Sequence, residues 1–217
     1  ASNPLITLFA SLDALWIGTR VGPSALAAVS TSLFWIWIVV SLAEMIGVGL
    51  TAVAARRYGE GRPREAARVV GDAMRYAVVL GLVVAGVGSL VIDWMFAIMN
   101  TPPEVSALGR SYLHVYLLGA PLIYGYFAVD AAFRAAGDTR TPLVLLSSSV
   151  AVTMLLDPVL ILGLWGAPRL GVTGAAVALI FTRSVVFVIG IAILRRRGML
   201  RFGRIRWPNV GAVTRVG

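Results

Sequence analysis

Apolar residues dominate this chain in six long runs, and turn residues or arginines separate the runs. A membrane-spanning helix needs about 20 largely apolar residues at 1.5 Å per residue. The first run is short for a span, and the second is long enough to tilt or protrude. The pattern predicts an all-α membrane protein, a bundle of six transmembrane helices. We expect the spans at about 4–19, 26–55, 73–99, 108–132, 142–163 and 172–194.

Turn residues support these boundaries. The segment 137–142 predicts a tight turn, with Pro142 in the first turn of the fifth span and Thr141 as its cap. Pro121 interrupts the fourth span. Residues 207–217 are less apolar than the runs before them. We therefore expect one six-helix lobe over 1–206, and an interfacial segment or a linker toward a second lobe over 207–217.

The composition excludes a water-soluble fold. Hydrophobic residues make up 59% of the chain and charged residues only 13%, and the mean hydropathy is +0.87. Soluble domains carry about 25% charged residues. A chain with so few charges cannot cover its surface in water, so its natural solvent is lipid.

The formal net charge of +9 comes from nineteen basic residues, all of them arginine. Most lie in the gaps after the second, fourth and sixth spans, and basic residues collect in the cytoplasmic loops of membrane proteins. The charge therefore predicts topology rather than nucleic-acid binding. We expect a multi-pass protein of a bacterial or archaeal cell (inner) membrane, with both ends in the cytoplasm. The arginines in or bordering these gaps are Arg56, Arg57, Arg62, Arg64, Arg68, Arg75, Arg134, Arg140, Arg195, Arg196, Arg197, Arg201, Arg204, Arg206 and Arg215.

Chemistry-bearing residues for an enzyme are scarce. The chain has no cysteine, and His114 is its only histidine. Disulfides, thiolate metal sites and a cysteine nucleophile are thereby excluded, and a histidine metal cluster or a serine–histidine–aspartate triad is not expected. We expect neither a bound metal nor a cofactor, and no enzymatic activity.

Three acids lie well inside predicted spans: Asp13, Glu44 and Asp157. Charged residues at such positions are costly and mark functional sites. Asp13 and Asp157 each precede the outer end of their span by six residues, so both lie about 9 Å below that end. Carboxylates at one depth can share a cavity, where their repulsion favours binding a proton. The alternative is two unrelated acids, each satisfied by hydroxyl groups.

The residue after Asp157 strengthens its candidacy. Pro158 lacks an N–H group and clashes with the carbonyl four residues back, that of Met154. The expected kink would leave backbone oxygens beside a carboxylate, and free carbonyls at broken helices coordinate cations in transporters. The alternative is a kink that serves packing alone.

Other polar residues have two interpretations each. Glu44 and Arg183 fall near the middle of the second and sixth spans, and they either form an ion pair or contact a substrate. Asp130 and Arg134 are four residues apart, which favours a surface pair. Tyr112 lies near the outer end of its span, where an interfacial anchor is more common than a ligand contact.

Five segments, in order, resemble the N-terminal lobe of the MATE (multidrug and toxic compound extrusion) transporters. They cover nearly the whole chain, and each falls at the matching helix or loop of the family. The segments are LDALWIG at 12–18 with Gly22 and ALAA at 25–28, ARRYGEG at 55–61, FRAAGDTRTP at 133–142, LDP at 156–158 and GVTGAA at 171–176.

The resemblance implies one lobe of a twelve-helix transporter with two six-helix lobes. It implies export of small organic, often cationic, compounds in exchange for protons or sodium, with no cofactor. Asp13 and Asp157 match the family's N-lobe acids, and Tyr112 roughly matches a tyrosine of their network. Thr153 stands where many members have Asn, and Leu179 stands near where many have Thr, so a thinner polar network is expected around Asp157.

Complete members of this family are about twice as long as this chain. We therefore expect the second six-helix lobe in the same full-length protein, or else in a second parallel copy. The lipid bilayer and a small organic substrate are the other expected partners, and nucleic acid is not. Two alternative functions remain: a flippase for lipid-linked oligosaccharides of the same superfamily, and a non-transporting membrane subunit.

Overall fold

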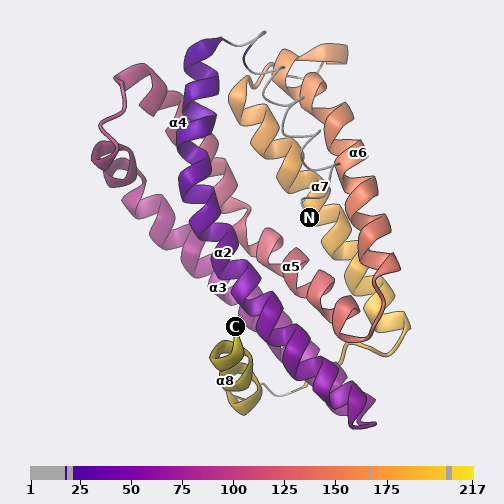
Figure 1. The fold of residues 1–217 in the computed structure, drawn as a ribbon. Coiled ribbons are helices and arrows are strands. Elements are labelled where there is room, and N and C mark those ends of the chain that lie inside the picture. Colours follow the sequence, from indigo (N-terminus) through magenta and orange to yellow (C-terminus); the bar gives the residue numbers. More distant parts are fainter. Residues whose placement is uncertain (1–17, 19–21, 167, 204–206) are drawn as a thin grey trace. The chain divides into compact units, whose positions relative to one another are not determined.

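A computed structural model of the chain describes residues 18, 22–166, 168–203 and 207–217. These residues form long α-helices joined by short turns (Figure 1). The elements, in chain order, are α2 (Pro23–Gly59), α3 (Pro63–Ile98), α4 (Pro103–Leu118), α5 (Ala120–Ala135), α6 (Arg140–Leu162), the short 3₁₀ helix η1 (Leu164–Gly166), α7 (Val172–Arg196) and α8 (Trp207–Val216).

Among the described residues, four helices are long and apolar enough to cross a membrane: α2, α3, α6 and α7. The pair formed by α4 and α5 passes the same test when it is counted as one broken span. The chain is therefore an all-α, multi-pass membrane protein, as predicted. The predicted first span at 4–19, with Asp13, lies outside the described residues apart from Gly18.

Prolines mark where several helices begin. Pro23, Pro63 and Pro103 each occupy the first position of a helix, where a missing N–H costs nothing and the proline ring favours helical φ. Arginines lie in the last turns of α2 and α7, where cations complement the helix dipole. At 37 residues, α2 is about 55 Å long and exceeds the bilayer core of about 30 Å, so one or both of its ends protrude.

The two internal prolines have different effects. The fourth predicted span is broken between α4 and α5 at Gly119, two residues before Pro121. By contrast, α6 continues as one helix through Pro158. Proline cannot donate, so the carbonyl oxygen of Met154 still lacks its helical hydrogen bond.

Asp138, rather than Thr141, caps the start of α6. Its carboxylate accepts the backbone N–H groups of Arg140 and Thr141, at 3.1 and 2.9 Å. Thr141 donates its hydroxyl to the same carboxylate at 2.6 Å, so its oxygen is not the cap. These Thr141 bonds, with a bond from Arg197, lower the pKa of Asp138 to about 2. The turn is therefore a charged junction of α5, α6 and the end of α7.

The helices contribute to two compact units, described separately here. Unit 1 comprises 1–38, 84–119 and 147–182. Within it, Ser32 donates to the carbonyl of Ala28 at 2.8 Å and lies 3.4 Å from that of Gly109. Gly109 lets the Phe96 ring approach the α4 backbone, and a Cβ there would overlap that ring. Close helix packing in this unit thus depends on small residues, as is usual in lipid.

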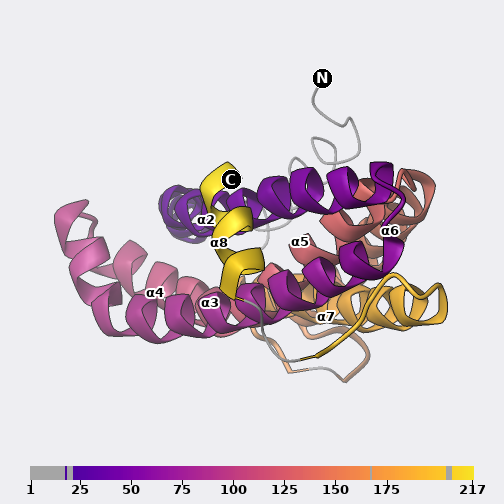
Figure 2. The same cartoon turned by 90° about the horizontal axis from the view of Figure 1, so that it is seen from below.

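Unit 2 comprises 39–83, 120–146 and 183–217. The hydroxyl of Tyr124 donates to the carbonyl of Val39 at 2.8 Å, which ties α5 to α2. Gly125 and Gly190 receive the Phe187 and Val129 side chains, respectively, so α5 and α7 pack closely. Helix α8 contacts α3 near its start and packs against α2 with its second half (Figure 2).

Gly81 in α3 faces the start of α5 at close range. A Cβ at this position would lie within 2.9 Å of three backbone atoms of Ala120 and Pro121. We expect Gly81→Ala to lower the free energy of unfolding by about 1–3 kcal/mol, because the backbone cannot yield as a side chain would. Heat unfolding of the full-length protein in detergent measures this change.

Gly86→Ala is the matched control, because it makes the same change in α3 with nothing within 4 Å. It should be neutral, or stabilising by about 0.5–1 kcal/mol, since Ala has the higher helix propensity. Equal melting temperatures for the two variants would contradict the close contact at Gly81.

Candidate functional site

Asp157 is buried in unit 1, on the apolar span α6. The residue as a whole is only 3% exposed. Thr153 and Ser149 precede it by four and eight residues and are also buried, at 2% and 5% exposed. Residues spaced by four lie on one face of a helix. One face of α6 therefore carries a buried carboxyl and two buried hydroxyls within a largely apolar span.

Thr182 of α7 joins this face. The hydroxyl oxygens of Thr153 and Thr182 lie 2.8 Å apart, and either can donate. Thr153 also lies 2.8 Å from the carbonyl oxygen of Ser149, and Thr182 lies 3.0 Å from that of Ala178. Each hydroxyl has one proton. Two protons are thus shared among more than two acceptors, so the hydrogen-bond direction in this hydroxyl pair can reverse.

Thr182 was missed by the sequence analysis, which looked for a threonine near Leu179. Thr182 lies three residues further along α7, nearly one turn away, and it is 2% exposed. A polar residue inside an apolar run was the available signal. Thr182 therefore adds a buried hydroxyl near Asp157 that the Leu179 position did not predict.

The remaining unit 1 candidates are placed as follows. Tyr112 is on α4 and only 6% exposed, so it is buried rather than exposed at an interface. Pro158 directly follows Asp157 within α6, next to the Met154 carbonyl that it leaves without a helical donor. Asp13 lies outside the described residues, and its pairing with Asp157 stays a prediction.

Unit 2 contains a pocket of about 540 Å³ between α2 and α5. Both helices contribute apolar and polar residues to its lining, and the polar groups are two carboxylates, one guanidinium and one hydroxyl. Thr51 donates to the carbonyl of Gly47 at 2.8 Å, within the pocket wall. The lining residues are Glu44, Gly47, Val48, Thr51, Ala52, Phe127, Asp130 and Arg134.

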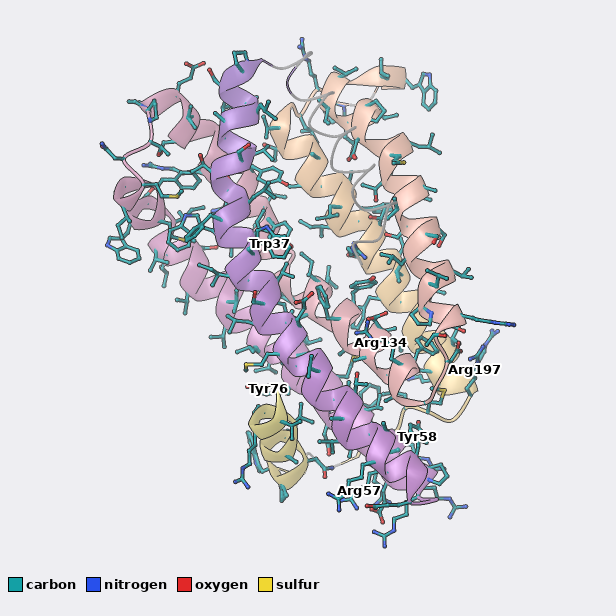
Figure 3. All side chains as sticks on the ribbon, in the orientation of Figure 1. Trp37, Arg57, Tyr58, Tyr76, Arg134 and Arg197 are labelled. Atoms are coloured by element: carbon teal, nitrogen blue, oxygen red, sulfur yellow. The ribbon has the colours of Figure 1, made fainter. Side chains whose placement is uncertain are left out.

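The charges in this pocket are unequally compensated. Asp130 and Arg134 form the predicted pair on α5, with 2.6 Å between carboxylate and guanidinium, and Figure 3 labels Arg134 there. Glu44 is exposed and makes no hydrogen bond or salt bridge with another described residue. The pocket therefore carries one uncompensated negative charge.

The alternative of an ion pair between Glu44 and Arg183 is not formed among the described side chains. The Arg183 guanidinium instead lies over the Tyr126 ring, 4.3 Å from its centroid. Its Nη1 is buried and has no hydrogen-bond partner in the described part of the chain. A cation over an aromatic face is partly stabilised by the ring quadrupole.

Within the described residues, no three His, Cys, Asp or Glu side chains gather as a metal site. The arrangement is instead a buried carboxyl–hydroxyl cluster in unit 1 and an acidic, partly apolar pocket in unit 2. Such groups can bind a proton or a monovalent cation and an organic cation, respectively.

Comparison with known proteins decides the family. The family model MatE matches residues 1–159. The chain belongs to the MatE family. Among curated MatE relatives, a probable multidrug resistance protein of Bacillus subtilis, YoeA, is 30% identical over 90% of this chain and 42% of its own length. An FAD transporter of Shewanella oneidensis is 28% identical over 88% of the chain and 42% of its own length.

The fold agrees with this family. The bent form of the Vibrio cholerae MATE transporter VcmN superimposes with a TM-score of 0.86 at 22% identity, over 96% of this chain and 47% of VcmN. The chain therefore spans less than half the length of these MatE relatives and corresponds to one lobe of the twelve-helix fold. The relatives are transporters rather than enzymes.

The hydroxyl pair yields a stability prediction. Thr182→Val keeps the side-chain shape but removes the bond to Thr153, so we expect unfolding to require about 0.6–2 kcal/mol less free energy. Thr182→Ser keeps the hydroxyl, so it should retain most of the free energy of unfolding that Thr182→Val loses. The check is heat unfolding of the full-length protein in detergent.

Thr31→Val is the matched control, because the one bond of the Thr31 hydroxyl to a described residue is within its own helix, to Ala27 at 2.9 Å, on an exposed face. It should leave the melting temperature unchanged. A loss as large as that of Thr182→Val would show that the interhelical bond has no special weight.

Proposed function

We propose that this chain is one lobe of a secondary active antiporter that exports organic, often cationic, compounds in exchange for protons or sodium. The observation that carries the proposal is Asp157, a 3% exposed carboxyl inside a membrane span beside the Thr153–Thr182 hydroxyl pair. The second lobe belongs to the same full-length protein. Both ends of this lobe lie at the cytoplasmic side of a bacterial or archaeal cell membrane.

The coupling role of Asp157 follows from the cost of an ionised group in a dry span. A bare carboxylate there is unfavourable by several kcal/mol, and a bound proton or sodium ion removes that penalty. The Met154 carbonyl, left free by Pro158, offers a neutral oxygen ligand near the carboxyl. Both coupling ions suit this oxygen-rich set.

Asp13 is the second coupling carboxyl in this proposal. Its predicted depth matches that of Asp157, and two carboxyls at one level bind one proton or cation more readily than either alone. Loading the pair removes charge from the first and fifth predicted spans. The loaded and empty lobes then favour different packings of the first span, and this difference couples ion entry to substrate exit.

The unit 2 pocket is the proposed contact for the substrate. Its volume of about 540 Å³ lies in the range of small-molecule sites. Phe127 and Val48 supply apolar contact, and Glu44 supplies the uncompensated negative charge. Two carboxylates against one guanidinium favour a cation over the anionic substrate that a lipid-linked oligosaccharide flippase requires.

The coupling proposal is tested with Asp157→Asn and Asp13→Asn in the full-length protein. Each substitution removes the titrating group and keeps the shape of the side chain. Each should therefore lower the rate of efflux driven by a proton or sodium gradient by about 100-fold or more. Efflux from proteoliposomes under an imposed gradient measures the effect.

Asp93→Asn is the matched control, since the exposed Asp93 carboxylate pairs with Arg110 at 2.8 Å outside the buried cluster. It should transport normally. Gradient-driven efflux that survives in both Asp157→Asn and Asp13→Asn would exclude the coupling role of these two acids. A lack of substrate-dependent flux in the unaltered protein would instead favour a non-transporting subunit.

Glu44→Gln tests the substrate contact. Removing the uncompensated charge should raise the KM for a lipophilic cation about tenfold, while transport of a neutral compound of similar size stays unchanged. The comparison is made on KM and kcat separately, with Glu104→Gln as the control, because Glu104 is exposed in the first turn of α4. Equal losses for both substrates would assign Glu44 to the structure instead of to cation recognition.

A further inference from the structure

A second pocket of unit 2 lies between α2 and α8 and has a volume of about 440 Å³. Its walls combine arginines with small apolar side chains. Arg56 and Arg57 are in the last turn of α2, and Arg215 is in the last turn of α8. The apolar lining residues are Ala52, Val53, Ala212 and Val216.

The wall formed by α8 is held by specific contacts. Gly49 packs against the carbonyl of Val213 and Met45 packs against Gly217, so the second half of α8 packs closely on α2. Val213 is 1% exposed. The first turn of α8 is tied to α3, since Asn209 donates to the Asp72 carboxylate at 2.8 Å. Asp72 in turn pairs with Arg75 at 2.7 Å. The pocket is therefore a built feature of the unit.

The arginines retain donors for a ligand. Arg56 bonds Glu60 through Nε, and Arg57 contacts Glu60 and Glu65 through one terminal nitrogen. Arg215 forms no hydrogen bond or ion pair with any described residue. A guanidinium carries five N–H donors in a planar fork that matches phosphate oxygens. The three arginines of the pocket carry three positive charges, and the neighbouring Glu60 and Glu65 carry two negative charges. The net charge of this group is therefore +1.

The position of the pocket selects the ligand. Arg56 and Arg57 lie at the end of the membrane span α2, where Figure 3 labels Arg57 and Tyr58. Trp207, at the start of α8, is 75% exposed, as an interfacial aromatic residue is. A ligand at this level meets lipid headgroups on one side and acyl chains on the other. The arginines suit a phosphate, and Ala52, Val53 and Val216 suit hydrocarbon.

We infer that the α2–α8 pocket binds an anionic phospholipid, with its phosphate on Arg56, Arg57 and Arg215 and the start of its acyl chains on the apolar wall. Basic pockets between membrane helices are recognised sites for anionic headgroups. The bound lipid bridges α8 and α2. It thereby fixes the segment that follows the sixth predicted span.

The test compares binding of phosphatidylglycerol and phosphatidylcholine to the full-length protein by native mass spectrometry after delipidation. The variant is Arg56→Gln/Arg215→Gln. We expect its preference for phosphatidylglycerol to fall by at least about fivefold. The control is Arg64→Gln/Arg68→Gln, which removes the same charge from exposed arginines of α3 outside the pocket, and its preference should be unchanged.

Two outcomes would overturn the inference. Equal losses in both double variants would mean that only the overall charge attracts anionic lipid. A thermal stabilisation by inorganic phosphate alone, as large as that by phosphatidylglycerol and lost in the pocket variant, would mean a site for soluble phosphate. The single variant Arg215→Gln repeats the comparison without touching the Glu60 pairs, so impaired folding of the double variant does not decide the result.

Discussion

The bilayer offers no hydrogen-bond partners, and this constraint determines most of what the chain does. Every backbone N–H and C=O inside it must be satisfied internally, so the described spans are helical. The hydroxyls of these helices follow the same rule. Thr31, Thr51 and Thr153 bond to carbonyls four residues back. One departure from that rule is the Met154 carbonyl, which lacks its helical donor because of Pro158 and lies beside the proposed coupling residue Asp157.

Helix association in lipid gains little from burying apolar surface, because the surrounding acyl chains are equally apolar. The units instead rely on small residues that let backbones approach. Gly81, Gly109 and Gly190 are examples, because the space that a Cβ would take at each is filled by a neighbouring backbone or side chain. Large apolar residues such as Leu90 and Trp37 are left exposed, which suits a surface covered by lipid. Because apolar packing differs little between helix faces, interhelical polar contacts such as Thr153–Thr182 contribute strongly to which helix faces pack together.

Charge is distributed by the same physics. Several ion pairs of the described residues lie near helix ends and turns, where water and headgroups reduce the cost of the charge. Other charged groups lie inside spans. Asp157 is buried next to hydroxyls, and Arg183 is stabilised over the Tyr126 ring. Glu44 lies on a pocket wall without a paired cation, and this makes it a candidate for ligand recognition rather than for structure.

Local pattern alone predicted the described helices, the break near Pro121, the Asp130–Arg134 pair and Asp157 as a candidate, because each depends on residues close in sequence or on the cost of charge in lipid. The tertiary structure decided which faces meet. It paired Thr182 with Thr153, placed Arg183 on Tyr126 instead of Glu44, and buried Tyr112. Nearly uniform apolar helices carry little rotational signal, since lipid-facing and core-facing residues are alike. Contacts between distant helices therefore depend on packing that the one-dimensional pattern does not contain.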